Sequence, residues 1–427
     1  MSRYLFCYYG DDFTGSTDAL EALAANGVPA VLFLDPPAAE LLARFPQCRA
    51  VGIAGESRSQ GPGWMSDHLP AIFARLAALD PGVCHYKVCS TFDSSPVCGS
   101  IGRALEIGQD VFHTSWVPVI PAAPHLRRFV LFGNLFAAGG GTIHRIDRHP
   151  TMRQHPVTPM DEGDLRIHLA RQTGRPISLL DVLALRGRNP EEQLDGVLSA
   201  QPRAVIFDGL DEATLSVTGR LLWQHRAQAR FAVGSSGLIE SLVREWRELG
   251  EIPREYSPAA AAPVDRIVVV SGSCSPVTEQ QIRWATANGF AGIPVGPQPE
   301  VIQGAVGPAL DALARGRGVV VYSALGPAGR AEGAGGEGLG RALGILLRDI
   351  LLRSGVRRAV VAGGDTSSHS VRQLDVDALT FAGRMTPGAP LCHCHAPGRP
   401  LDGLELVLKG GQMGPENFFE MVRRTTI

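Results

Sequence analysis

Two adjacent aspartates, Asp11 and Asp12, follow the first hydrophobic run of the chain in the stretch GDDFTGSTD. The run from Tyr4 to Tyr9 carries no charge, which is typical of a strand buried on both faces of a parallel sheet. After the acids, Asp18 and Glu21 have the spacing of a helix capping box. The two carboxylates therefore stand at the carboxyl end of a strand, where open α/β sheets bind ligands. There they can take a proton from a substrate hydroxyl or hold a metal; the alternative is that Asp12 caps a turn and Asp11 is solvated.

Composition limits the classes of protein to consider. A chain of 427 residues exceeds one ordinary core, so two domains are expected. The 40 basic and 42 acidic residues give a net charge of −2 without basic clusters, which argues against a nucleic-acid partner. Neither a membrane-spanning run nor a signal peptide is evident, so we expect a cytoplasmic protein without a membrane partner. The eight cysteines are scattered, which suits reduced thiols, and a homo-oligomer is left open.

The order of apolar runs, small-residue turns and helical patterns predicts an α/β fold. We expect two domains, each a largely parallel sheet flanked by helices, with an interdomain cleft. The stretch rich in proline and alanine from Pro253 to Arg266 predicts a linker, so the domains are 1–255 and 264–427. The strands expected in the first domain are Tyr4 to Tyr9, Val28 to Leu34, Ala50 to Ala54, Val83 to Val88, Phe129 to Phe132 and Ala204 to Phe207. Those expected in the second are Ile267 to Val270, Val319 to Tyr322, Ala359 to Val361 and Leu404 to Leu408.

Polar residues follow nearly every expected strand of the first domain. Because parallel strands end at the same edge of a sheet, these residues predict a ring of candidate ligands. The ring comprises Asp11, Asp12, Asp35, Glu56, Ser57, Arg58, Ser90, Thr91, Asp93 and Asp208.

Three turns of the second domain resemble one another chemically: VVVSGSCSPVTEQQI, VVAGGDTSSHSV and LVLKGGQMGPENFF. Each runs from an apolar strand through glycines and hydrogen-bonding residues into a helix. Glycines let backbone N–H groups approach a phosphate, and a helix N-terminus adds a favourable dipole. None of the three is a P-loop or a dinucleotide fingerprint. Together they predict a nucleotide site.

Four separated motifs carry a family resemblance: GDDFTGSTD, HPVTPMDEGDL (His155 to Leu165), VVAGGDTSSHSV and LKGGQMGPENFF. In this order they resemble the four-carbon acid sugar kinase family over almost the whole chain. The resemblance implies a sugar-binding N-terminal domain and an ATP-binding C-terminal domain. It further implies ATP-dependent phosphorylation of a hydroxyl on a small sugar acid, such as a tetronate or its 3-oxo form.

The segment KVCSTFDSS (Lys87 to Ser95) departs from the family pattern. Cys89 stands where many members have aspartate, and Asp93 where they have an arginine suited to clamping a carboxylate. The substrate's polar groups are therefore expected to be arranged differently. The variant resembles the branch that acts on 3-oxo sugar acids, including 3-oxo-tetronate kinases, and the following PVCGSIG indicates a relative such as a 3-oxo-isoapionate kinase. These alternatives stay open.

Phosphoryl transfer needs a positioned hydroxyl, a phosphate cradle, a divalent cation and usually a carboxylate base, so ATP and Mg²⁺ are the expected cofactors. Asp12 is the predicted base; Asp365, whose other role would be a helix cap, and Asp93 are the competing candidates. Asp11 would assist the substrate or the metal. Arg58 and Lys87 are predicted to bind the substrate's carboxylate and oxo groups, and Ser90, Thr91 and Asp93 its hydroxyls. The residues predicted to bind ATP are Ser273, Gly363, Gly364, Asp365, Thr366, Lys409, Gly410 and Gly411.

Two clusters suggest a metal, CHCHAPG (Cys392 to Gly398) and HRIDRHPTMRQHP (His144 to Pro156), but neither has the paired spacing of a zinc site, so no metal site is predicted. In the second cluster Arg148, His149 or His155 would reach anionic ligand groups or lie on the surface.

Two other classes of protein fit the sequence less well. A dinucleotide-dependent oxidoreductase would need a glycine fingerprint where GDDFTG places carboxylates. A non-catalytic sugar-acid-binding or regulatory protein would have no need for three phosphate-type turns.

Overall fold

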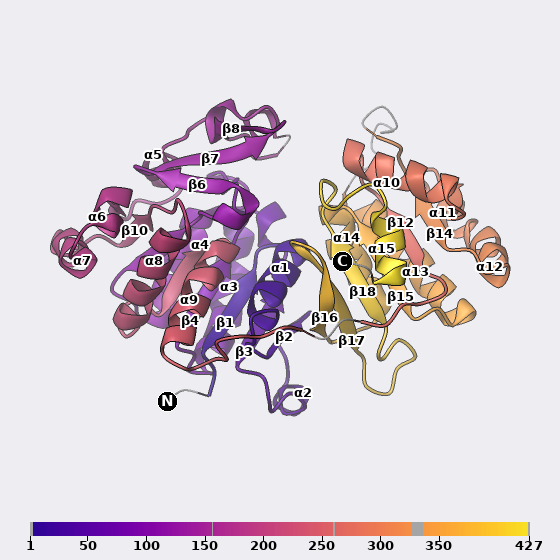
Figure 1. The fold of residues 1–427 in the computed structure, drawn as a ribbon, viewed down its shortest axis with the longest axis horizontal. Coiled ribbons are helices and arrows are strands. Elements are labelled where there is room, and N and C mark those ends of the chain that lie inside the picture. The colour runs from indigo at the N-terminus through magenta and orange to yellow at the C-terminus, as the bar shows by residue number, and fades with distance from the viewer. Residues whose placement is uncertain (1–2, 156, 259–260, 327–335, 426–427) are drawn as a thin grey trace. The chain divides into compact units, whose positions relative to one another are not determined.

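The computed structural model describes residues 3–155, 157–258, 261–326 and 336–425. The chain divides into two compact units. Unit 1 comprises the chain up to Ala30 together with Pro36–Tyr256, and unit 2 comprises Val31–Asp35 together with the chain from Ser257 onward. Each unit is a sheet flanked by helices (Figure 1), which confirms the predicted α/β class.

The main sheet of unit 1 has the strand order β3-β1-β4-β11-β5-β10-β9, and every neighbouring pair is parallel. Gly10 pairs with Ala54 on one side and with Lys87 on the other, so β1, β3 and β4 end at one level. The residues of these three strands are all buried, as expected for strands covered on both faces. The strands are β1 (Phe6–Gly10), β3 (Ala50–Ala54), β4 (Val83–Lys87), β5 (Val117–Ile120), β9 (Ile177–Leu180), β10 (Ala204–Phe207) and β11 (Phe231–Gly234).

Helices of unit 1 pack in groups. Helix α9 contacts both α1 and α8, and α3 contacts α4. The close packing of α8 against α9 needs Gly219, since a Cβ there would lie 1.9 Å from the Ser241 carbonyl oxygen. The helices are α1 (Phe13–Ala24), α2 (Ala39–Leu42), α3 (Pro62–Ala77), α4 (Ile101–Phe112), α5 (Leu165–Ala170), α6 (Val182–Arg186), α7 (Pro190–Leu198), α8 (Glu212–His225) and α9 (Ser236–Glu248).

Helix α1 begins directly after the two aspartates. Asp12 is its N-cap, and Asp12 Oδ1 accepts a hydrogen bond from the Gly15 amide at 2.6 Å. The capping box expected at Asp18 and Glu21 is wrong, because both residues lie inside the helix. The cap brings the N-terminus of α1 to the edge where β1, β3 and β4 end.

The strand expected at Phe129 to Phe132 lies outside the main sheet. It is β6 (Arg128–Leu131), which forms a small antiparallel sheet with β7 (Asn134–Gly139) and β8 (Thr142–Arg145). Asp208, after β10, accepts amide hydrogen bonds from Phe132, Gly133 and Val182. Its carboxylate is therefore occupied by backbone amides, and the expectation that Asp208 belongs to the ring of candidate ligands is wrong.

The sheet of unit 2 has the order β13-β14-β12-β15-β18-β17-β16-β2. The first five strands are parallel, whereas β17, β16 and β2 are antiparallel to their neighbours in this series. The strands are β2 (Ala30–Phe33), β12 (Val268–Ser271), β13 (Ala291–Pro294), β14 (Val319–Tyr322), β15 (Arg358–Ala362), β16 (Ala378–Thr386), β17 (Ala389–His395) and β18 (Glu405–Lys409).

Helices α10 (Pro276–Ala287) and α15 (Phe418–Arg424) of unit 2 contact each other, and α13 (Glu337–Ser354) contacts α11 (Pro299–Gln303), α12 (Val306–Ala314) and α14 (Gly364–Val371). Asp35, expected among the candidate ligands of the first domain, belongs to unit 2 and pairs there with Arg372 at 3.1 Å. Among the described helices, none combines the length and apolar character needed to cross a bilayer.

Candidate active site

Arg58 joins the two aspartates that follow β1. Its Nε and Nη2 donate to Asp11 Oδ2 and Oδ1 at 3.0 and 2.6 Å, and its Nη1 donates to Asp12 Oδ2 at 2.6 Å. The backbone reinforces this arrangement, because the Arg58 amide donates to the Asp11 carbonyl at 3.1 Å. A guanidinium has five N–H groups, so two remain without a partner among the described residues. Arg58 can thus hold the acid pair and still donate to a ligand.

Lys87, the last residue of β4, forms a buried ion pair with Asp18 of α1. The Lys87 Nζ to Asp18 Oδ2 distance is 3.0 Å, and the two side chains are 3% and 14% exposed. Burial alone would lower the pKa of Lys87, but the Asp18 carboxylate outweighs it and raises the pKa, so the ammonium stays charged. The sequence does not predict this partner, because the spacing of Asp18 and Glu21 indicates a helix cap instead.

Gly15 lies beside these cations, on the first turn of α1. A Cβ on Gly15 would lie 2.6 Å from Asp12 Oδ1, 3.4 Å from Lys87 Nζ and 3.7 Å from Arg58 Nη2. Gly15 therefore lets the backbone of the first turn of α1 pass close to the Asp12 carboxylate and the two cations, where a side chain would collide. The N-terminus of a helix adds amide donors and a positive dipole end to these two cations, a combination that favours an anionic ligand.

Asp93 is buried near the same arginine. It accepts a hydrogen bond from Thr91 Oγ1, and Thr158 Oγ1 lies 3.4 Å from its other oxygen. Thr158 is also hydrogen-bonded to His155 Nδ1, at 3.0 Å from its hydroxyl. The motif beginning at His155 thus lies beside Asp93, a long-range proximity that no spacing in the sequence indicates.

The carboxylates around Arg58 differ in their tendency to ionise. Burial raises the pKa of Asp11 to about 6; the Arg58 charge works against this rise and the Asp12 charge adds to it. For Asp93, burial also favours the neutral form, but the Arg58 charge and the Thr91 hydroxyl outweigh it and hold the pKa below its ordinary value. Asp93 is therefore ionised at neutral pH, and it would repel a carboxylate and accept hydroxyl protons.

In unit 2 the three glycine-containing turns converge. Ser271, Ala362 and Lys409 end β12, β15 and β18 in register. A Cβ on Gly411 would lie 2.5 Å from Ser273 Oγ, and one on Gly363 would lie 2.9 Å from Thr366 Oγ1. Gly363 has φ of 122°, a value that favours glycine. The backbones of the three turns thus meet at one edge of the sheet.

The predicted residues fall into two groups. Unit 1 brings together Asp11, Asp12, Arg58, Lys87 and, near Arg58, Thr91 and Asp93; Ser90 is buried in the same segment after β4. Unit 2 brings together the turns that carry Ser273, Gly363, Gly364, Thr366, Lys409, Gly410 and Gly411. Asp365 lies in the first turn of α14, but its side chain is outside the described part of the structure.

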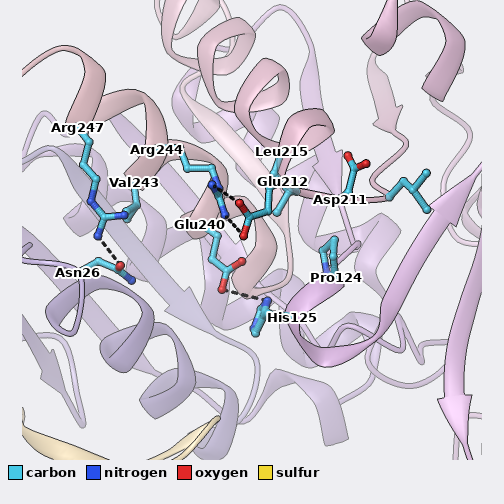
Figure 2. A pocket seen from close by; sticks show the side chains of 11 residues that line it. Asn26, Pro124, His125, Asp211, Glu212, Leu215, Glu240, Val243, Arg244 and Arg247 are labelled. Atoms are coloured by element: carbon cyan, nitrogen blue, oxygen red, sulfur yellow. Dashed lines mark hydrogen bonds and ion pairs between the residues drawn. The ribbon is translucent and has the colours of Figure 1, made fainter. Parts of the chain in front are cut away.

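A pocket of about 450 Å³ lies elsewhere in unit 1, among α8, α9 and the residue Asn26 beyond α1 (Figure 2). Its charged and polar groups face one another: His125 with Glu240, Arg244 with Glu212, and Arg247 with Asn26. Its lining does not include Asp11, Asp12, Arg58, Lys87 or Asp93. We therefore do not assign the substrate to it.

The histidine and cysteine clusters have ordinary structural partners. His149 is buried, and its Nδ1 accepts amide hydrogen bonds from Thr151 and Met152. His395 pairs with Thr380 through its Nε2 at 2.7 Å. Within the described ranges, His, Cys, Asp and Glu side chains do not gather in threes as a metal would require.

Comparison with known proteins identifies the family. A model of a "sugar-binding N-terminal domain" matches residues 6–242, and one of a "nucleotide-binding C-terminal domain" matches residues 268–419. The chain belongs to the four-carbon acid sugar kinase family. This membership confirms the resemblance found in the sequence, and it disfavours the oxidoreductase and regulatory-protein alternatives.

Two relatives of the kinase cover nearly its whole length. A 3-oxo-isoapionate kinase of Paraburkholderia graminis is 48% identical over 98% of this chain and 94% of its own. A 3-oxo-tetronate kinase of Pseudomonas fluorescens is 32% identical over 98% and 96% of the respective chains. A solved protein from Salmonella typhimurium has the same fold, with a TM-score of 0.81, 25% identity and 99% coverage of both chains.

Proposed function

We propose that this sugar-acid kinase transfers the γ-phosphate of ATP to a hydroxyl of a branched 3-oxo sugar acid, with 3-oxo-isoapionate as its substrate. The observation that carries this proposal is the 48% identity to a 3-oxo-isoapionate kinase, against 32% to a 3-oxo-tetronate kinase at the same coverage. The acidic Asp93, where the family pattern has an arginine, is consistent with a substrate that presents hydroxyls at this position.

The substrate carboxylate would bind near the N-terminus of α1, on the side of the two cations. There it would meet Lys87, the remaining N–H groups of Arg58 and the amides of the first turn of α1. Asp93, being ionised, would direct the carboxylate away from itself and bind a hydroxyl, together with Thr91 and Ser90. One charged end and one hydroxyl-bearing end of the substrate would thus be fixed by different parts of the site.

Asp12 is our proposed general base. Both oxygens of Asp11 are held by Arg58, and the Asp11 side chain is 6% exposed, whereas that of Asp12 is 17% exposed. Arg58 would fix the orientation of Asp12, so that its carboxylate can take the proton of the attacking hydroxyl. Asp93 and Asp365 are the alternatives that the experiment below distinguishes.

The turns of unit 2 would bind the phosphates of ATP through backbone amides, the hydroxyls of Ser273 and Thr366, and the Lys409 ammonium. They fit such a group, because the glycines let the turns approach one another closely, where a Cβ would collide with a neighbouring side chain, and this brings their backbone amides together. Mg²⁺ would neutralise charge on the phosphates, which supply much of its ligand set in kinases. Since phosphoryl transfer is direct, the hydroxyl and the γ-phosphate must meet during turnover.

The test is ADP release with Mg²⁺-ATP and a panel of 3-oxo-isoapionate, 3-oxo-tetronates and tetronates. We expect the highest kcat/KM with 3-oxo-isoapionate. Asp12→Asn should lower kcat by about 10²-fold or more while leaving the KM for ATP unchanged, since a general base contributes about 10² to 10⁴. Asp80→Asn is the matched control, because Asp80 lies in an exposed ion pair with Arg230, outside the motifs of the site.

Each other outcome has a definite meaning. A preference for a linear 3-oxo-tetronate would overturn the proposed substrate but not the kinase. Full turnover in Asp12→Asn would move the base to Asp93 or Asp365. A failure to release ADP with every sugar acid of the panel would refute the proposed reaction.

A further inference from the structure

The chain contains only two lysines. Of its 40 basic residues Lys87 and Lys409 alone are lysines, and every other one is an arginine. An arginine is charged at every physiological pH, whereas a lysine can lose its charge when buried. Both lysines are buried and end a strand beside a candidate site, Lys87 on β4 and Lys409 on β18. They differ in one respect: Lys87 has a carboxylate partner and Lys409 has none among the described side chains.

The surroundings of Lys409 lack a counter-ion. Its Nζ donates to Thr278 Oγ1 at 3.1 Å and lies 5.9 Å from the centroid of the Phe418 ring. Its residue exposure is 0%. Burying an ammonium without an ionic partner is costly, because one hydroxyl and one ring replace only a part of its hydration.

The position of Thr278 adds to the cost of burying the Lys409 ammonium without an ionic partner. Thr278 lies in the first turn of α10, behind the N-cap Ser275, and its hydroxyl donates to the Gly411 carbonyl at 2.8 Å. The Lys409 ammonium therefore lies beside the positive end of a helix dipole, which repels a cation. Two positive features meet where the three glycine-containing turns converge, and the described residues supply no anion to balance them.

The charged groups on the neighbouring elements are engaged with one another. The pairs are Glu279 with Arg283 on α10, Glu420 with Arg423 and Arg424 on α15, and Arg358 of β15 with Glu405 of β18. On α14, Asp365 has a side chain outside the described part of the structure and His369 is half-buried. Burial is the effect that lowers the pKa of Lys409, to about 7. Above this pH the side chain is mostly neutral in the nucleotide-free protein.

We propose that a phosphate group of the nucleotide is the missing counter-ion of Lys409, so that nucleotide binding is coupled to protonation of this side chain. The inference rests on the proposed ATP site. A phosphate within reach of Nζ favours the charged form, and the bound nucleotide raises the affinity of Lys409 for a proton. By linkage, nucleotide binding takes up a proton at pH values above about 7, where the free side chain has lost it.

The first experiment is calorimetry of a non-hydrolysable ATP analogue at pH 8, in two buffers that differ in ionisation enthalpy. Any proton exchange by the phosphates of the analogue is common to the wild type and Lys409→Arg, so the difference between the two proteins isolates the contribution of the lysine. With a free-state pKa of about 7, about nine-tenths of the Lys409 side chains are neutral at pH 8, so we expect uptake of close to one proton per nucleotide. Lys409→Arg, which stays charged, should bind without uptake.

A second experiment needs no variant. Because the chain has two lysines, protein labelled with ¹³C at lysine Cε gives two side-chain signals, and Lys87 is the internal control. Without nucleotide, the Lys409 signal should titrate near pH 7 while the Lys87 signal stays in its charged form. With the analogue bound, the Lys409 midpoint should move upward by two pH units or more.

The outcomes separate this inference from the proposed function. An active kinase that binds the analogue without proton uptake, uptake that persists in Lys409→Arg, or a Lys409 midpoint unchanged by the analogue would each overturn the coupling and leave the kinase intact. A protein that binds neither ATP nor the analogue would overturn both.

Discussion

Removing the carboxylate of Asp18 isolates the charge of Lys87. In the structure the Lys87 side chain is 3% exposed and its ammonium lies 3.0 Å from Asp18 Oδ2. Asp18→Asn keeps the size of the side chain but leaves a buried ammonium without this partner. Removing one member of a buried pair costs about 3 to 5 kcal/mol. Because the Asp11 charge also acts on Lys87, we expect the lower end, about 3 kcal/mol of unfolding free energy.

The pH dependence gives the sign of this effect. In the wild type the pKa of Lys87 is raised, so its stabilising contribution is constant between pH 7 and pH 9. In Asp18→Asn burial lowers the pKa of Lys87 below that of the unfolded chain, and the deficit shrinks as the pH rises, by up to about 1.4 kcal/mol per pH unit.

Urea unfolding at pH 7 and pH 9, followed by tryptophan fluorescence, measures both quantities, since four of the five tryptophans lie in unit 1. Asp161→Asn is the control, because its pair with Arg171 is exposed and is worth less than about 1 kcal/mol. An Asp18→Asn protein as stable as this control at pH 7, or a deficit that grows toward pH 9, would refute the reasoning.

Three further predictions concern other parts of the chain. Burial raises the pKa of Asp11 to about 6, so its contribution to stability is lost as the pH rises from about 4 through 6. Asp11→Asn should therefore reduce the change of the urea unfolding midpoint with pH over that range, and the same change with pH as in the wild type would contradict this. Gly219→Ala should lower stability by about 2 kcal/mol or more, since its Cβ would lie 1.9 Å from the Ser241 carbonyl oxygen, whereas Gly196→Ala on α7 meets nothing within 4 Å and should raise thermal stability slightly; equal melting temperatures would contradict this. Gly411→Ala would displace Ser273 and Ser275 and should weaken nucleotide binding about tenfold in calorimetry, while substrate binding to unit 1 is retained. An undiminished affinity for the nucleotide would contradict the assignment of these residues to the nucleotide site.

Several strands could be read directly from the sequence. Ala50–Ala54, Ala204–Phe207 and Val319–Tyr322 have the predicted bounds, because each is an apolar run ended by polar residues or glycine. The interior strand β5 (Val117–Ile120) is absent from the predicted strands. Pro118 argues against a strand inside a sheet, because proline cannot donate a hydrogen bond to a neighbouring strand.

The sites were predictable to the extent that strand ends define them. Asp11, Arg58 and Lys87 follow or end neighbouring parallel strands, so the alternation of strands and helices was enough to bring them together. The partners of these residues were not predictable. The pairing of Asp18 with Lys87 and the approach of Thr158 to Asp93 depend on how the helix and the loop pack, which no local pattern encodes.

Strand β2 has a consequence for how the protein is made. It pairs with β16 in unit 2, although the chain on both sides of it belongs to unit 1. A ribosome that adds 5 to 20 residues per second reaches β16 roughly 20 to 70 seconds after completing β2. The nascent chain must keep this hydrophobic strand from pairing wrongly for that time, and a fragment that begins at Ser257 would lack it altogether. Gene fragments meant to yield the nucleotide-binding half alone should therefore carry residues 31–35 as well, for example by circular permutation.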